Sequence, residues 1–323
     1  MKNYNHPKYK KGCPAYCPAA LFIGGMTVKR KGKGNLVGYA FVLPAVIYML
    51  VFIGYPIVYN WVISFQDATA FTLKDSGRAF IGFSNYKAIF SDPTFAHAIQ
   101  HTFIYTIGCL VIQFTIGFLL AMFFAKKFTF AKPIRGLVVI SWMLPVTVTA
   151  LVFKFMFSQD SGIINTLLMN LHIIDEPIGW LLNGGTGMAV LIIANSWVGI
   201  PFNMLLLTTG LNNISTDVYE AASIDGATKR QQFFKITLPL LKPTIMSTLV
   251  LGFVLTFKVF DLVYVMTGGG PVDSTEVLST YSYKLSFQQF QFGQGAAAAC
   301  VLFVCLFIVA LIYLKTISTS EVD

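Results

Sequence analysis

Three residues within one apolar segment have side chains suited to contact a polyhydroxylated solute such as a sugar. Asn195, Gly199 and Phe202 are spaced at i, i+4 and i+7, so they share one face of a predicted helix. The amide of Asn195 can donate and accept hydrogen bonds with hydroxyls, Gly199 leaves room, and the Phe202 ring can stack on a pyranose face. Polar groups inside such segments face either a cavity or another helix, so these residues could also join two helices.

A second face with the same spacing lies nearer the C-terminus. Gly252, Thr256 and Val259 again occupy positions i, i+4 and i+7 of an apolar segment. Thr256 could face a cavity, or it could join two helices while Gly252 serves as a packing notch. The residues by themselves leave both alternatives open.

Lys258 and Asp261 place a base and an acid three residues apart within an apolar segment. At that spacing they would share one face of a helix, where they could neutralise each other and extend toward water. The alternative is a proton relay, which would make the chain an ion-coupled secondary transporter. We favour mutual neutralisation.

The sequence holds no constellation for catalysis, metal binding or ATP hydrolysis. Its four histidines are scattered: His6, His97, His101 and His172. His6 with Cys13 and Cys17 supplies fewer ligands than the about four that structural zinc sites use. No phosphate-binding loop of the G-x-x-x-x-G-K-[ST] type occurs. We therefore predict no enzyme activity, no metal and no cofactor on this chain.

Long apolar runs must position these residues. The chain has 323 residues, of which 55% are hydrophobic and 11% charged, whereas soluble domains carry roughly 25% charged residues. Six stretches reach the about 20 residues needed to cross a bilayer, near 36–58, 102–125, 136–157, 188–210, 243–264 and 293–314. We therefore predict an all-α polytopic membrane protein with six transmembrane helices, in which residues 1–35 form a basic tail and 36–323 the transmembrane domain.

The distribution of Lys and Arg orients the predicted helices, because basic loops stay in the cytoplasm. These residues gather in the tail 1–35 and in the segments 126–135 and 211–242. The opposite loops hold only Lys74, Arg78, Lys87 and Lys284. We predict cytoplasmic N- and C-termini and a cytoplasmic loop at 211–242. The tail would rest on anionic membrane lipid, and the net charge of +9 then needs no nucleic-acid partner.

A polar segment between two apolar runs has the most specific spacing in the chain: Glu220-Ala221-Ala222, Gly226 and Ile236-x-Leu238-Pro239. Asp217 can cap a helix, with Glu220 reaching back to the cap amide. Ala221 and Ala222 make one face of that helix flat. Gly226 can end the helix, because glycine readily takes a positive φ.

A second short helix is predicted directly after this glycine, since Thr228 and Gln231 repeat the capping pattern. The second helix presents Phe233, Phe234 and Ile236. Two short helices at an angle, carrying apolar side chains, would fit a groove on a soluble partner. The alternative is an amphipathic hairpin that lies on the membrane surface.

The full spacing of residues 220–239 resembles the EAA coupling loop of bacterial ABC importer permeases, the element through which a membrane subunit grips its ATPase. Further stretches are similar to the carbohydrate-uptake branch of that family, the MalF/UgpA-like six-span form: residues 82–93, Asn195–Phe202, Phe260-Asp261-Leu262 and Thr267–Pro271. The similarity covers roughly residues 36–315 and implies the ABC type I importer permease fold.

This resemblance implies a bacterial plasma-membrane importer of a carbohydrate, which we expect to be an oligosaccharide. The chain would be one of two homologous permeases, working with two copies of a cytoplasmic ATPase that binds ATP and Mg and with an extracellular sugar-binding protein. The residues implied in ATPase coupling are Glu220, Ala221, Ala222, Asp225, Gly226, Phe233, Phe234, Ile236, Leu238 and Pro239. Those implied in the substrate pathway are Asn195, Gly199, Phe202, Gly252, Thr256 and Val259.

Overall fold

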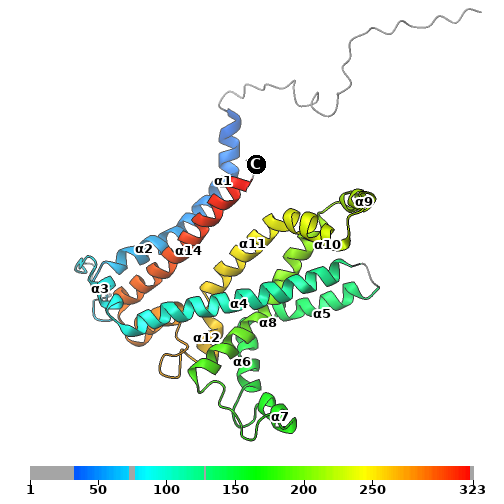
Figure 1. Ribbon diagram of the computed structural model, residues 1–323. Helices are drawn as coiled ribbons and strands as arrows, with labels where there is room; N and C mark the ends of the chain where they lie inside the picture. The colour runs from blue at the N-terminus through cyan, green and yellow to red at the C-terminus, as the bar shows by residue number, and fades with distance from the viewer. Residues whose placement is uncertain (1–32, 73–76, 127–128, 321–323) are drawn as a thin grey trace, which may run out of the picture. The chain divides into compact units, whose positions relative to one another are not determined.

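The computed structural model describes residues 33–72, 77–126 and 129–320 (Figure 1). The predictions about His6, Cys13 and Cys17 fall outside these ranges, as does most of the basic tail. Contacts divide the chain into two units, Met1–Ile57 and Val58–Asp323, and each is described by itself.

The first apolar helix is continuous but changes its hydrogen-bonding pattern partway. It consists of α1 (Lys33–Met49), the π-helical segment η2 (Leu50–Gly54) and α2 (Tyr55–Ser64). The stretch Tyr39–Ser64 is long enough to cross a bilayer, and its most apolar part has no buried residue. Apolar side chains all around a helix are typical of a helix that contacts lipid or another chain.

The second unit is built almost entirely of helices. In chain order these are α3 (Ser84–Phe90), α4 (Pro93–Ala125), α5 (Ala131–Met143), α6 (Val146–Met156), α7 (Ile163–Asn170), α8 (Gly184–Asn212), α9 (Thr216–Ile224), α10 (Lys229–Gln232), the π-helical η3 (Phe233–Thr237), α11 (Leu238–Phe257), α12 (Asp261–Met266), α13 (Leu278–Tyr283), the π-helical η4 (Lys284–Gln288) and α14 (Phe292–Ser320). The described loops add an isolated antiparallel bridge between Gln66 and Phe80. The prediction of an all-α chain is confirmed for the described residues.

The predicted spans agree with the helices except for the second, the third and the fifth. The helices long and apolar enough to cross a membrane, among the described residues, are Tyr39–Ser64, Pro93–Ala125, Gly184–Asn212, Lys229–Phe257 and Phe292–Lys315. The predicted third span, 136–157, is instead broken into α5 and α6, which are bent by 93°. The break lies at Leu144, whose extended backbone (ψ 140°) is the conformation that the following Pro145 favours. The predicted six spans are reached only if this bent pair counts as one.

The second span begins earlier than predicted, at Pro93 rather than near Thr102. Asp92 caps it, because Asp92 Oδ1 accepts a hydrogen bond from the Thr94 amide at 2.9 Å. Pro93 lies in the first turn, where the missing N–H of proline costs no helix hydrogen bond. The Asp92-Pro93 pair is therefore a helix start that hydropathy alone does not reveal.

The predicted fifth span, 243–264, also differs from the structure. The helix runs without interruption from Lys229 through α10, η3 and α11 and ends at Phe257, before the separate short helix α12. Beyond this end the Val259 carbonyl accepts a hydrogen bond from the Ser279 hydroxyl instead of an amide of a continuing helix. The apolar run thus extends past the helix, since the loop residue Val259 is half-buried against the core.

Two predictions about this region are wrong as a result. Lys258 follows the last turn of α11 and Asp261 begins α12, so the two do not share a helix face. Both side chains are exposed and no ion pair joins them, since the ion pairs within the described residues belong to Lys284. Val259 likewise lies beyond the helix that carries Gly252.

Close contact between α4 and α8 forms the centre of the second unit (Figure 1). Gly108 of α4 lies against Ile192, and Gly117 against Asn203, so closely that a β-carbon on either glycine would collide. Small residues of this kind let two helix backbones approach each other within a membrane. α11 contacts both helices and buries Leu241 against them. These three helices carry or border the predicted pathway residues.

Candidate coupling segment and substrate pathway

The end of α9 has the geometry that the sequence predicts for Gly226. The Gly226 amide donates to the Ser223 carbonyl at 3.2 Å, and the Ala227 amide donates to the Ala222 carbonyl at 2.9 Å. These bonds form a Schellman motif, which needs a residue with positive φ, and Gly226 has φ +77°. Gly226 therefore ends α9 and turns the chain toward α10, as predicted.

One of the two predicted caps is confirmed and the other is wrong. At the start of α10 the Gln231 amide donates to Thr228 Oγ1 at 3.3 Å and the Thr228 amide donates to Gln231 Oε1 at 2.8 Å, which is a capping box. At the start of α9, however, Ser215 is the cap, since its hydroxyl accepts from the Asp217 amide at 3.3 Å. Asp217 lies in the first turn instead, where its charge interacts favourably with the helix dipole.

A buried glutamine fixes α9 against α10. Gln232 is only 4% exposed, and its Nε2 donates to Ser223 Oγ at 2.9 Å and to the Ala227 carbonyl at 3.3 Å. A second link joins Tyr219 and Thr237, whose hydroxyl oxygens lie 2.9 Å apart. Gln232 was missed from the sequence, because a glutamine beside basic residues gives no sign of burial. The two links make α9, α10 and η3 one rigid unit, called the coupling segment below.

We expect Gln232→Ala to loosen α9 without unfolding the protein. The variant removes the two hydrogen bonds from Gln232 to Ser223 and Ala227, each worth about 0.5–1.5 kcal/mol. Hydrogen–deuterium exchange of the α9 amides should therefore accelerate by about tenfold. Gln231→Ala is the matched control, since it removes an exposed capping side chain from α10 and should leave α9 unchanged. Equal exchange in α9 for both variants would show that the buried glutamine has no such role.

The coupling segment presents charged and apolar groups together on its exposed surface. Glu220, Ala221 and Asp225 are exposed. Ile224 is 87% exposed and Phe234 is 55% exposed. Figure 1 shows α9 and α10 beyond the ends of α8 and α11. Exposed apolar side chains on a rigid projection are typical of a docking surface.

The remaining predicted coupling residues anchor or border this face. Phe233 packs edge-on against Phe118 of α4, with ring centroids 6.3 Å apart. Ile236 helps to line a hollow of about 330 Å³ beside Gly226. The other members of the predicted set are half-buried or exposed: Ala222, Leu238 and Pro239. Phe233 thus fastens the segment to α4, while Phe234 is left to face outward.

On α8, the predicted pathway residues divide between two surroundings. A β-carbon on Gly199 would collide with the side chain of Gln113 on α4, and Gln113 Nε2 donates to the Asn195 carbonyl at 3.3 Å. The Phe202 ring instead lies 5.7 Å from the ring of Trp142 on α5, measured between centroids. Gly199 therefore packs against α4, which is one of the two alternatives left open. Phe202 belongs to a half-exposed aromatic pair.

On α11, Gly252 and Thr256 are both buried. A β-carbon on Gly252 would lie 3.0 Å from Leu110 of α4. α4 therefore borders both predicted faces, with Gln113 beside α8 and Leu110 beside α11. Gln113 was missed, although an amide inside an apolar run is a signal that the sequence contains, because such a group must find a partner.

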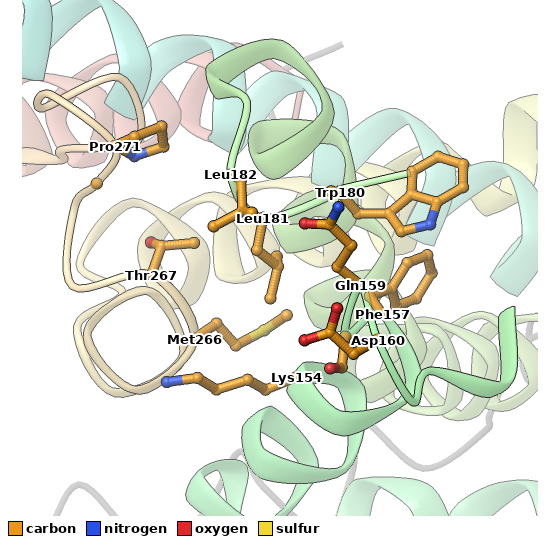
Figure 2. Close-up of a pocket in the computed structure, with 13 residues that line it drawn as sticks. Lys154, Phe157, Gln159, Asp160, Trp180, Leu181, Leu182, Met266, Thr267 and Pro271 are labelled. Carbon is orange, nitrogen blue, oxygen red and sulfur yellow. The ribbon is translucent and has the colours of Figure 1, made fainter. Parts of the chain in front are cut away.

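A pocket of about 470 Å³ lies between the α6–α8 region and the end of α12 (Figure 2). Lys154 of α6 lines one edge, and its Nζ donates to the Val265 carbonyl of α12 at 3.0 Å. Figure 2 shows Gln159 and Asp160 on one side of the pocket and Thr267 on the other. Lys154 thus ties the bent α5–α6 region to α12. The pocket brings together loops that no motif in the sequence connects.

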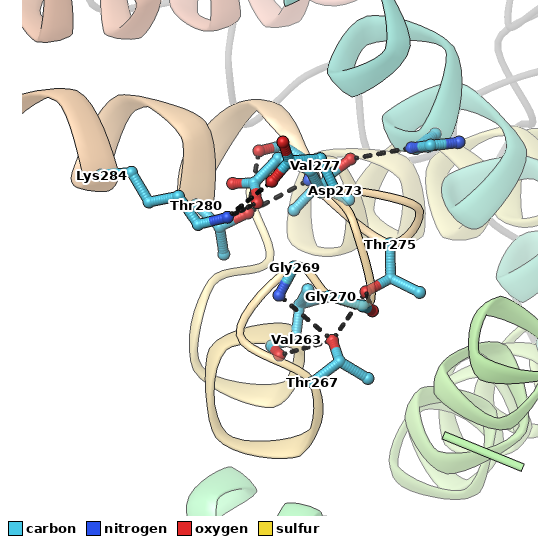
Figure 3. Close-up of polar contacts among 11 residues, drawn as sticks. Val263, Thr267, Gly269, Gly270, Asp273, Thr275, Val277, Thr280 and Lys284 are labelled. Atoms are coloured by element: carbon cyan, nitrogen blue, oxygen red, sulfur yellow. Dashed lines mark hydrogen bonds and ion pairs between the residues drawn. The ribbon is translucent and has the colours of Figure 1, made fainter. Parts of the chain in front are cut away.

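The loop after α12 is a tightly bonded turn, as its glycines and proline predict. Gly268 and Gly269 take φ values of +60° and +90°, which end the helix. Thr275 Oγ1 lies 2.8 Å from Thr267 Oγ1 and 2.7 Å from the Gly270 carbonyl, which close the loop on itself (Figure 3). The helix α12 therefore ends at this glycine-rich turn.

Next to this turn a buried carboxylate pairs with a lysine. Glu276 is fully buried and contacts Lys284 Nζ, which also lies 3.0 Å from Asp273 Oδ1 (Figure 3). Burial raises the pKa of Glu276, although the hydrogen bond from Lys284 acts in the opposite direction. Burial disfavours the charged form of Lys284 too, but its two carboxylate partners prevail and raise the pKa of Lys284. This pair was also missed, because neither residue belongs to a motif.

We expect Lys284→Met to destabilise the protein by about 3–5 kcal/mol near pH 8, because Glu276 stays buried without its partner. The pKa of Glu276, already raised by burial, should rise further. The folded state then binds a proton that the unfolded state releases, so stability falls as the pH rises and the deficit shrinks toward about pH 5. Thermal unfolding at both pH values measures the effect. Lys284→Met with Glu276→Gln should recover most of the loss, and a deficit independent of pH would contradict the pairing.

Comparison with known proteins gives a consistent result. Residues 113–321 match the model of a family described as binding-protein-dependent transport system inner membrane component. The lactose transport system permease protein LacF of Rhizobium radiobacter is 33% identical over 287 residues, which cover 88% of this chain and 94% of LacF. The trehalose/maltose transport system permease protein MalF of Thermococcus litoralis is 31% identical over 291 residues, covering 90% of this chain and 96% of MalF.

A solved structure has the same fold. In the crystal structure of a bacterial ABC transporter involved in the import of the acidic polysaccharide alginate, one chain superposes with a TM-score of 0.75 at 23% identity. The match covers 88% of the present chain and 96% of that chain. At this identity the likeness establishes the fold alone.

Proposed function

Because this chain belongs to the family of binding-protein-dependent transport system inner membrane components, we propose that it is the permease subunit of an ATP-driven importer of a carbohydrate. The relatives named for lactose and for trehalose/maltose support this substrate class, and the chain covers nearly the whole length of each. The proposal rests mainly on the coupling segment. This segment is rigid and exposed, and its sequence has a spacing that resembles that of an ATPase-binding loop. An oligosaccharide is the expected cargo.

The coupling segment would seat in a groove on a separate cytoplasmic ATPase, which binds the ATP and Mg. Its exposed face combines acids, Glu220 and Asp225, with the apolar side chains of Ile224 and Phe234. Burying such apolar groups in a complementary groove would supply the free energy of docking. The internal bonds of Gln232 support this role, because a segment that is already ordered loses little entropy on binding.

A single helix joins the coupling segment to the proposed pathway. The chain is helical without a break from Lys229 to Phe257, a length of about 43 Å at 1.5 Å per residue. Gly252 and Thr256 lie near the far end of this helix. A displacement at the coupling segment would therefore move them as part of one body, which supports the alternation between outward- and inward-open states.

The sugar would pass along α8 and α11, beside the surfaces on which α4 packs. We assign contacts to the Asn195 side chain and the Phe202 ring on α8 and to Thr256 on α11, with Val259 at the outer end. Gly199 and Gly252 would set how closely α4 approaches, since a β-carbon at either position would press on an α4 side chain. Hydroxyls need polar partners and pyranose faces need rings, and both kinds are present here.

We also propose the orientation and the partners. The distribution of Lys and Arg supports cytoplasmic termini and a cytoplasmic segment 211–242. The loop after α12 would then face outward, toward an extracellular sugar-binding protein. A second, homologous permease would complete the pathway, because a symmetric pair of ATPases needs two coupling segments. The exposed apolar surface of Tyr39–Ser64 leaves room for that permease or for lipid.

The rival functions have less support. An ion-coupled secondary transporter would use Lys258 and Asp261, but these residues do not share a helix face and are both exposed. A scaffold or sensor would use the coupling segment to recruit a soluble protein without moving a solute. Neither rival explains why a continuous helix should lead from that segment to polar residues within the bundle.

The experiment that separates these functions is uptake of radiolabelled sugars by vesicles containing the complete transporter. Maltose, trehalose and lactose form the first panel. We expect at least one sugar to accumulate with ATP and the binding protein, and ionophores that collapse ion gradients should not prevent it. Accumulation driven by an ion gradient without ATP would establish the secondary transporter, and absence of any sugar uptake would contradict the proposed function.

A further inference from the structure

Four aromatic side chains beside the break between α11 and α12 form a cluster, in which three rings all contact one another and the fourth contacts one of them. Phe260 and Tyr264 stack with ring centroids 5.1 Å apart and planes 17° from parallel. Tyr283 lies 5.0 Å from both of these rings, and Phe287 lies 5.1 Å from Tyr283. These residues come from α12 with its preceding residue and from α13 with η4. They are called the aromatic ladder below.

The aromatic ladder is not part of the hydrophobic core. None of its members belongs to the buried clusters of the described residues or packs against them as a partly buried neighbour. Phe287 is 60% exposed and Tyr264 is 37% exposed. On a membrane protein such an exposed aromatic surface contacts lipid, another chain or a ligand.

The surrounding structure holds the rings in place. The Tyr264 amide donates to the Phe260 carbonyl at 2.9 Å, which fixes the first two rings one helical turn apart. Tyr283 directly precedes Lys284, whose ammonium group is held by the two carboxylates described above. The Ser279 hydroxyl joins α13 to the Val259 carbonyl at the break. The ladder is therefore preorganised, which lowers the entropy cost of binding a ligand.

The ladder continues outward from the proposed sugar pathway. Phe260 directly follows Val259, and Thr256 lies four residues earlier, in the last turn of α11. Lys258 and Asp261, both exposed, flank its inner end. An acid and a base that are exposed and not paired with each other require water, so this end of the ladder faces an aqueous space rather than lipid. The polar groups also offer hydrogen bonds to a hydroxylated ligand.

We propose that the aromatic ladder is a second carbohydrate-binding subsite, occupied before the sugar reaches α8 and α11. This inference rests on the proposed function. The C–H groups on one face of a pyranose ring carry a partial positive charge, which the negative face of an aromatic ring attracts. The hydroxyls of Tyr264 and Tyr283 can bond to sugar hydroxyls at the edge of the stack. A cluster of rings, in contrast to a single ring, offers an oligosaccharide more than one surface on which to stack.

Saturation-transfer difference NMR on the complete importer in nanodiscs tests the proposal. The ligand is whichever of maltose, trehalose or lactose the vesicles accumulate, added without binding protein or ATP. Native protein should transfer magnetisation to the C–H protons of the sugar ring. Tyr264→Ala and Tyr283→Ala should each weaken the apparent affinity by about fivefold, as expected for loss of one aromatic contact.

Two control variants separate stacking from a general loss of structure. Tyr264→Phe keeps the ring and should retain most of the signal. Phe80→Ala removes an aromatic side chain that is 76% exposed but lies outside the ladder, and it should bind as the native protein does. Co-purification of every variant with the ATPase shows that the importer has assembled.

The possible outcomes are distinct. A native importer that accumulates sugar while Tyr264→Ala and Tyr283→Ala bind it unchanged would overturn the ladder and leave the proposed function intact. The same result combined with quenching of tyrosine fluorescence by headgroup-labelled lipid would identify the ladder as a membrane-interface belt instead. Absence of uptake for every sugar would contradict the proposed function, and the ladder would fail with it.

Discussion

Replacing Gly226 with tryptophan should reduce ATP-driven uptake at least tenfold, while the protein still folds and inserts. A β-carbon at Gly226 meets no other atom within 4 Å, so the new side chain would project from the coupling segment into the proposed interface. A clash there removes docking free energy comparable to that of an interface hot spot, about 2 kcal/mol or more. Uptake and transport-coupled ATP hydrolysis by the reconstituted importer measure the effect.

Asparagine at the same position is the matched control. Gly226 has φ +77°, a conformation that costs most residues about 1–2 kcal/mol but that asparagine tolerates. Gly226→Asn should therefore retain most of the uptake, because its side chain is short. An equal loss of uptake in the two variants would show that backbone strain, not a clash at the interface, causes the effect. Normal uptake by Gly226→Trp would count against docking at this face.

Gly199→Leu should have the second largest effect, because α4 and α8 would be forced apart. A β-carbon alone at Gly199 would already collide with the Gln113 side chain. Overpacking of a tight helix contact costs about 1–3 kcal/mol, and the loss of the Gln113 bond to the Asn195 carbonyl adds to it. The melting temperature in detergent and the rate of sugar uptake should both decline strongly.

The partner residue supplies the control for this prediction. Gln113→Ala removes the group that occupies the space beside Gly199. The double variant Gly199→Ala with Gln113→Ala should therefore be more stable than Gly199→Ala alone, with a coupling energy of about 1 kcal/mol or more. Strictly additive effects would mean that the two side chains do not share this space in the membrane.

Features with a single local cause could be predicted from the sequence. Gly226 ends α9 because its position needs a positive φ, and the Thr228–Gln231 capping box follows from two side chains three residues apart. The glycines after α12 break the chain for the same backbone reason. The membrane-spanning helices could be located from the apolar runs, since a bilayer requires about 20 apolar residues for each span.

Features that depend on distant partners could not be predicted. The helix α11 ends at Phe257 because Ser279 of another element uses the Val259 carbonyl, and nothing in the apolar run indicates that contact. Gln232 is buried because Ser223 lies opposite it. The prediction that Lys258 and Asp261 share a helix face was wrong for the same reason. It assumed that one helix continues through the whole apolar run.

The central claim is that the coupling segment docks on a separate ATPase, and photo-crosslinking tests it most directly. A photoreactive amino acid replaces Ile224, which is 87% exposed on that segment. Phe71, which is 94% exposed in the loop predicted to lie on the opposite side of the membrane, is the control position. We predict that the photoreactive residue in place of Ile224 crosslinks to a soluble ATPase subunit and that the one in place of Phe71 does not. Capture of the ATPase from Phe71 alone, or of lipid alone from Ile224 in an actively transporting complex, would contradict the claim.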